Sequence, residues 1–160
     1  MYPDNGIREF CDRFQPCRKG RDWALANCTD MADAWDKLEP AWLIWVATRE
    51  GVLDDRTLRL WAAWCVRQVW RLVTDVRSRS AVETAERYAE GQATAYELAT
   101  AWSAALDASA ARAAAWTADW DACAAATCGA AGAAKAAAWA AQARQLRSMV
   151  ANPFRPGVLA

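Results

Sequence analysis

Arginine and tryptophan side chains recur at helical spacing between positions 56 and 71 of this chain. At about 100° per residue, four arginines fall on one side of a predicted helix, with two tryptophans among them. A guanidinium can stack on an indole face, and both residue types are common at the energetic centre of protein interfaces. The pattern therefore indicates recognition of a partner. The candidate partner-binding residues are Arg56, Arg59, Trp64, Arg67, Trp70 and Arg71.

A structural interpretation of the same residues competes with the first. The arginines of an interior helix can extend to the surface or pair with carboxylates of neighbouring helices. Fifteen acidic residues within the first ninety make such pairing easy. Tryptophan surrounded by several helices usually belongs to the core, so the composition favours this second interpretation.

Catalytic chemistry has little support in the sequence. The absence of histidine excludes Ser–His and Cys–His nucleophilic pairs, and neither a P-loop nor a dinucleotide fingerprint is present. Acid–base work would rest on carboxylates, for which helix capping or solvation is the simpler explanation. We therefore expect no enzyme and no cofactor. The carboxylate pairs are Asp54/Asp55, Glu83/Glu86 and Asp119/Asp121.

Six cysteines are expected to be reduced and mostly buried. None of them forms a C-x-x-C pair, so we expect no metal site, and no export signal favours disulfides. No stretch reaches the roughly 18–20 apolar residues of a membrane span, and we expect a soluble, cytoplasmic chain. The cysteines are Cys11, Cys17, Cys28, Cys65, Cys123 and Cys128.

Eleven tryptophans among long alanine runs determine the expected fold. Alanine has the highest helix propensity and little volume, whereas tryptophan supplies wide apolar area for a core. We expect an all-α fold: a compact multi-helix bundle, in a single domain over residues 1–160, that ends in a long antiparallel hairpin. Its parts are short Trp- and Cys-containing helices (1–50), two central helices (54–91), an alanine-rich helical hairpin (94–150) and a tail (151–160).

Capping residues and prolines predict where these helices begin. Asp30 is an expected N-cap, and Pro40 suits the first turn of a helix. Asp54 or Asp55 is expected to cap a helix that continues to about Asp75. The expected helices span residues 5–14, 19–27, 30–38, 40–48, 54–75, 80–91, 94–127 and 133–150.

Two capping boxes are expected in the second half of the chain. In Ser80–Glu83 and Thr94–Glu97, the hydroxyl and the carboxylate satisfy otherwise unpaired backbone donors. Gly91 is expected to close the helix that Ser80 opens.

The hairpin is expected to turn at two glycines, Gly129 and Gly132. Leu98, Trp102, Ala105 and Ser109 recur at steps of four and three residues, which is typical of helices packed as in a coiled coil. The prolines after Asn152 exclude a helix there. The tail is therefore either loose or a strap in which Phe154 docks.

Residues 75–91, DVRSRSAVETAERYAEG, followed by an alanine-rich helical tail, resemble bacterial helical families described as immunity proteins. This resemblance covers roughly residues 54–147 and implies a protein-binding inhibitor, without catalytic residues. The whole chain also resembles alanine- and tryptophan-rich proteins of phages and environmental bacteria, a resemblance that implies no particular activity. The residues that carry it are Phe10-Cys11, Asp22-Trp23-Ala24-Leu25, Pro40-Ala41-Trp42-Leu43, Leu53-Asp54, Trp64-Cys65 and Asn152-Pro153-Phe154.

Together these features predict a non-enzymatic protein-interaction module of the immunity or inhibitor kind, such as a phage antagonist of a host defence system. The expected partner is another protein, and a second copy of the chain is also considered. A nucleic-acid-binding accessory protein is an alternative, although zero net charge disfavours it. The other alternative is a small-molecule binder, or an enzyme that uses carboxylates.

Overall fold

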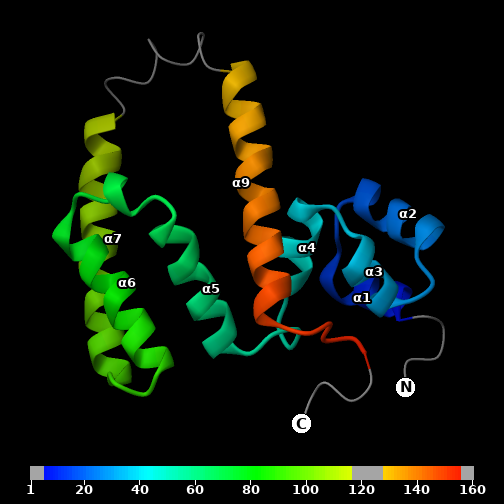
Figure 1. Cartoon of the computed structure of the whole chain (residues 1–160), viewed down its shortest axis with the longest axis horizontal. Coiled ribbons are helices and arrows are strands. Elements are labelled where there is room, and N and C mark those ends of the chain that lie inside the picture. The colour runs from blue at the N-terminus through cyan, green and yellow to red at the C-terminus, as the bar shows by residue number, and fades with distance from the viewer. Residues whose placement is uncertain (1–5, 117–127, 156–160) are drawn as a thin grey trace. The chain divides into compact units, whose positions relative to one another are not determined.

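The computed structural model describes residues 6–116 and 128–155 (Figure 1). In these ranges the chain forms α-helices and one short 3₁₀ helix, with no strand, so the predicted all-α class is confirmed. The elements are α1 (Ile7–Phe14), α2 (Arg18–Asn27), α3 (Met31–Lys37), α4 (Pro40–Ala47), α5 (Asp55–Arg67), η1 (Trp70–Leu72), α6 (Val76–Ala89), α7 (Ala95–Trp116) and α9 (Cys128–Met149).

The short N-terminal helices begin where local chemistry predicts. The Asp30 carboxylate accepts a hydrogen bond from the backbone N–H of Asp33 at 2.7 Å and caps α3. Pro40 is the first residue of α4, where its missing N–H costs no helical hydrogen bond.

The chain divides into two compact units. The expectation of a single domain stays a prediction. Unit 1 comprises Met1–Asp54 and Ala138–Ala160, and unit 2 comprises Asp55–Ala137. The boundary at Asp54 coincides with the expected start of the central helices. The second boundary falls inside α9.

Unit 1 is built around a core that unites the two ends of the sequence. Ile7 of α1, Trp35 of α3, Leu43 of α4 and Leu146 of α9 are the largest fully buried side chains in the described part of the chain. Each buries a large apolar surface, which is the main favourable contribution to folding.

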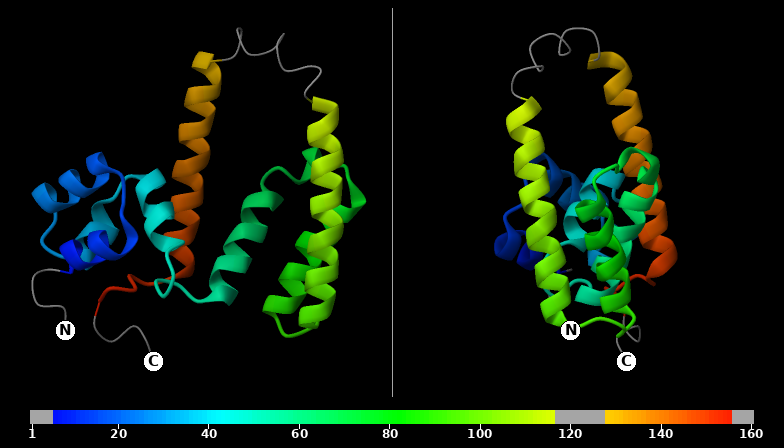
Figure 2. Two further views of the ribbon diagram at one scale, coloured as in Figure 1. Left: turned by 180° about the vertical axis from the view of Figure 1, so that it is seen from behind. Right: turned by 90° about the vertical axis from the view of Figure 1, so that its left-hand side faces the viewer.

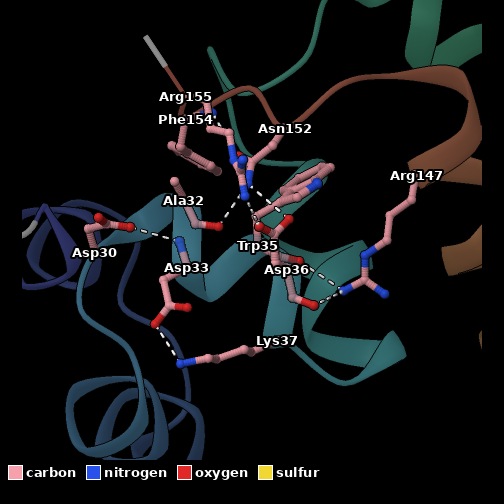
Figure 3. A network of polar contacts seen from close by, with 10 residues as sticks. All are labelled: Asp30, Ala32, Asp33, Trp35, Asp36, Lys37, Arg147, Asn152, Phe154 and Arg155. Atoms are coloured by element: carbon pink, nitrogen blue, oxygen red, sulfur yellow. Dashed lines mark hydrogen bonds and ion pairs between the residues drawn. The ribbon is translucent and has the colours of Figure 1, made fainter.

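The segment after α9 is a strap that is fastened to α3 (Figure 3). The Asn152 amide donates hydrogen bonds to the Ala32 carbonyl at 2.7 Å and to the Asp36 carboxylate at 3.1 Å. The Arg155 guanidinium pairs with Asp36 at 2.6 Å. The Phe154 ring lies 6.1 Å from the rings of both Phe10 and Trp35. Of the two alternatives for the tail, the structure therefore shows the docked one for residues up to 155.

In unit 2, α5 ends at Arg67, and the expected continuation to Asp75 is wrong. Val69, Val73 and Thr74 are β-branched and disfavour helix, so the chain tightens into η1 and then leaves it. The Arg79 guanidinium donates hydrogen bonds to the carbonyls of Trp70 and Val73. The Trp70 carbonyl also accepts from the backbone N–H of Val73 at 3.1 Å, so Arg79 adds a second donor there and supplies one to the Val73 carbonyl.

The expected Ser80–Glu83 capping box is also wrong, because α6 begins earlier, at Val76. Asp75 caps it, and its carboxylate accepts from the backbone N–H groups of Arg77 at 2.9 Å and Ser78 at 3.3 Å. Aspartate is as good an N-cap as serine and comes first along the chain. Gly91 follows α6 with φ +76°, a conformation that favours glycine.

The Thr94–Glu97 capping box is confirmed. The backbone N–H of Thr94 donates to the Glu97 carboxylate at 2.7 Å, and the backbone N–H of Glu97 donates to the Thr94 hydroxyl at 3.2 Å. These reciprocal bonds support the start of α7. In this unit α6 lies between α5 and α7 and packs against each of them (Figures 1 and 2).

The expected turn at Gly129 and Gly132 is wrong, because both glycines lie inside α9. A glycine within a helix costs about 1 kcal/mol relative to alanine, and the surrounding alanines favour the helix throughout. The expected helical residues 117–127 lie outside the described residues. Pairing of α7 with α9 as a hairpin stays a prediction, since α7 belongs to unit 2 and the last part of α9 to unit 1.

Candidate interaction groove

Arg67, one of the predicted partner-binding residues, is bound within the protein. Its Nε donates to Glu86 Oε1 at 2.9 Å and its Nη2 to Glu86 Oε2 at 2.6 Å, so two parallel bonds join α5 to α6. Hydrogen bonding to Glu86 raises the pKa of Arg67, and hydrogen bonding to Arg67 holds the pKa of Glu86 below its ordinary value. Glu86 is therefore a structural carboxylate and is poorly suited to donate a proton near neutral pH.

Arg56 and Arg59 also serve the contact between α5 and α6. Arg56 Nε donates to the Ala89 carbonyl at the end of α6, at 2.7 Å. The Arg59 guanidinium lies 5.0 Å from the centre of the Tyr88 ring and pairs with exposed Asp55 at 3.7 Å. These contacts agree with the structural interpretation of the arginine stripe.

Trp70 lies between two guanidinium groups, as stacking on arginine predicts. The Arg67 group is 3.9 Å and the Arg79 group 5.1 Å from the centre of its ring. Trp64 is half-buried on α5, whereas Arg71 is exposed. The structure thus brings Arg67 and Trp70 together and leaves the Arg71 side chain in solvent.

An apolar groove opens between the helices of unit 2. Its volume is about 820 Å³, and it is lined by side chains of α5, α6 and α7, by Leu72 at the end of η1 and by Val73 after it. Leu58, Ala62 and Val66 line it from α5, and Leu98 and Trp102 line it from α7. Because α5 and α7 both pack on α6, they form the two walls.

Large apolar side chains stand exposed at this groove. Leu72 is 69% exposed and Trp102 is 62% exposed, and both line it. The polar side chains in the lining are those of Asp55, Arg59 and Ser78. Exposed apolar area of this kind, with few polar groups, is typical of an interaction surface.

Sequence reasoning missed the groove, although it recognised some of its residues. We expected Leu98, Trp102 and Ala105 to form a seam between hairpin helices, and in the structure they line the groove. The feature of the sequence that could have revealed the groove was the row of alanines on α5 and α6, which faces these α7 residues. Small side chains leave space, but only the positions of the helices show whether another helix fills it.

The described cysteines are free thiols. Cys11 and Cys28 are buried, Cys65 is half-buried and Cys17 is exposed. Burial raises the pKa of Cys11, Cys28 and Cys65, which keeps these thiols protonated and weakly nucleophilic. The side chains of Cys123 and Cys128 lie outside those that the structure describes, and the described residues hold no cluster of metal-ligating side chains.

Two carboxylates of the predicted pairs have a partner within the described residues. Among the carboxylate pairs, Glu86 is engaged by Arg67, and Asp55 begins α5 beside Arg59. The pair Asp119/Asp121 lies outside the described residues.

No helix in the described ranges is long and apolar enough to cross a membrane. No protein-family model, curated protein or solved structure matches this chain. The two resemblances noted in the sequence therefore stay predictions.

Proposed function

We propose that this protein is a non-enzymatic interaction module that holds an amphipathic helix of a partner protein in the groove of unit 2. The exposure of Trp102 and Leu72 at the groove is the observation that carries the proposal. A solvent-exposed tryptophan beside an apolar depression is typical of the residues that dominate binding energy at interfaces.

A helix suits this groove better than a small polar ligand. Amphipathic helices bind by placing apolar side chains at i, i+3, i+4 and i+7 between the walls of a groove. The volume of about 820 Å³ also lies in the range of small-molecule sites, but such sites bury most of the ligand's surface, whereas Leu72 and Trp102 leave the lining of this groove open to solvent. Exposed Arg71, next to Leu72 at the groove, supplies a charge for an acidic residue of the partner.

The immunity-type inhibitor, including a phage antagonist of host defence, is a narrower form of this proposal. It adds the expectation that occupation of the groove blocks an activity of the partner. A nucleic-acid-binding role receives less support, because Arg56, Arg59 and Arg67 are engaged inside unit 2.

A photo-crosslinking amino acid at position 102 tests the proposal in cells of the source organism. Tyr96 supplies the matched control, since it is exposed on the same helix and does not line the groove. We expect one defined protein to crosslink at position 102 and not at position 96.

A second variant tests whether the partner binds in the groove. Ala62 is exposed and lines the groove from α5, so Ala62→Glu places a carboxylate among apolar side chains with little effect on folding. The crosslink at position 102 should then be lost. Equal crosslinking at positions 96 and 102, or a crosslink that survives Ala62→Glu, would contradict the proposal.

A further inference from the structure

A second cavity is formed by residues of unit 1 alone. It has a volume of about 240 Å³, is partly open to solvent, and is lined by α1, α2, α3, α4 and the segments that join them. Phe10, Trp42 and Trp45 supply aromatic rings to its wall, while Gly20 leaves room on α2. An engineered apolar cavity of about 150 Å³ in another protein admits benzene, so this one has room for a larger ring system.

The wall of this cavity carries no charged side chain. Cys11 is buried in it, and burial raises the pKa of its thiol, so the group stays neutral at pH 7. The charged groups of Arg49 and Lys19 lie over the Trp45 and Trp42 rings and do not line the cavity. A charged molecule would lose its hydration among the lining side chains, whereas an uncharged apolar molecule would lose nothing comparable. The lining therefore favours binding of uncharged ligands over binding of charged ones.

The aromatic rings around the cavity are held in place. The Phe10 and Trp45 rings meet edge to face at 6.2 Å, and the Trp42 ring lies 5.6 Å from that of Trp23. The Arg49 guanidinium lies 4.6 Å from the centre of the Trp45 ring and donates to the Trp45 carbonyl at 3.0 Å. Fixed rings favour a planar ligand, because stacked and edge-to-face contacts need defined orientations.

The distances around Gly20 show how little free space the cavity has on the α2 side. A Cβ at this position would lie 3.5 Å from Cys17 Sγ and 3.6 Å from Trp42 Cε2. These are ordinary contact distances, so alanine fits there, but a longer side chain must extend into the free space.

We propose that unit 1 binds a small, uncharged, planar aromatic molecule of one or two rings in this cavity. The site is independent of the groove, and it involves no covalent step.

Calorimetric titration with 2-naphthol, which is uncharged at pH 7, tests the proposal on the full chain. We expect saturable binding with one molecule per chain. Naphthalene-2-sulfonate keeps the ring system and adds a charge, so its affinity should be at least tenfold lower. Equal affinity for the two compounds, or no saturable binding of 2-naphthol, would overturn the proposal.

Two variants locate the site. Gly20→Leu should weaken 2-naphthol binding at least tenfold, whereas Ala62→Leu, which narrows the groove of unit 2, should leave it unchanged. The opposite result would assign the probe to the groove and contradict the proposal.

Alkylation of the wild-type protein tests where 2-naphthol binds, even if Gly20→Leu fails to fold. Cys17 is exposed and also lines the cavity, whereas Cys65 belongs to unit 2. Saturating 2-naphthol should slow iodoacetamide labelling of Cys17 severalfold, as measured by peptide mass spectrometry, and leave Cys65 unaffected. An unchanged rate at Cys17 would place the ligand elsewhere and refute the site.

Discussion

Arg67 and Glu86 form a two-point ion pair between α5 and α6, with N–O distances of 2.9 and 2.6 Å. Both side chains are about one-third exposed, at 35% and 29%. Water therefore screens the pair less than it screens a surface contact, and the planar guanidinium matches the carboxylate at two points.

Glu86→Gln is expected to lower the free energy of unfolding by about 1–2 kcal/mol, between the values for exposed and buried pairs. Urea denaturation followed by circular dichroism measures the change. Glu83→Gln on the same helix is the control, because Glu83 acts on Arg67 only through space, and it should cost less than about 0.5 kcal/mol. Equal losses in the two variants would show that the hydrogen-bonded geometry contributes nothing.

The contribution of this pair should depend on pH. The pKa of Glu86 is lower in the folded protein than its ordinary value, because Arg67 stabilises the carboxylate. The stability that the pair supplies is thus fully present above the ordinary pKa and is lost as the pH falls through the folded-state pKa. The difference in unfolding free energy between the wild type and Glu86→Gln should therefore shrink from pH 7 to pH 3. A constant difference would argue against the pKa shift as its source.

Arg147 fastens the end of α9 to the end of α3. Its Nη2 donates to the Trp35 carbonyl at 2.8 Å (Figure 3). It also donates to the Leu38 carbonyl at 3.1 Å, and α3 leaves both carbonyls open as it ends. Arg147→Ala should lower the unfolding free energy by about 2 kcal/mol, since half-buried acceptors lose a charged donor. Arg144→Ala, an exposed change on the same helix, should have little effect. Thermal unfolding of both variants makes the comparison, and similar midpoints would refute the role of Arg147.

Two tryptophans should differ sharply in what they contribute to stability. Trp35 is 2% exposed, and Trp35→Ala should cost about 3–5 kcal/mol or prevent folding. Trp102 is 62% exposed, so Trp102→Ala should change stability by less than about 1 kcal/mol. Chemical denaturation of both variants measures these values. A large loss from Trp102→Ala would mean that its ring is part of a core and would remove the basis of the proposed docking groove.

Local chemistry predicted the features that depend on nearby residues. Asp30, Pro40, Gly91 and the Thr94–Glu97 box act within one turn of their helix ends, so the sequence alone contains the information. The early end of α5 has a local cause in the β-branched residues Val69, Val73 and Thr74, but it is also supported from outside, because Arg79 of the next helix donates to the Trp70 and Val73 carbonyls. No periodicity within α5 encodes that bond.

The arginine stripe and the groove were harder to predict, because both depend on how the helices pack and not on residues close in the sequence. The arginine stripe was recognised, but whether Arg67 faces solvent or Glu86 depends on where α6 packs. The groove depends on the spacing of α5 and α7 on α6, and small side chains in a sequence do not reveal that spacing. The tail was left open between two alternatives, because the acceptors of Asn152 lie on α3, far away in the chain.

The division of unit 1 into two stretches of sequence has a consequence during translation. Ala143 and Leu146 of α9 complete a core that Ile7 and Trp35 begin, and all of unit 2 is synthesised between them. The nascent N-terminal helices therefore emerge from the ribosome without their closing partner and keep apolar surface uncovered until the last helix follows. Unit 2, encoded by one continuous stretch, is free to acquire its structure first.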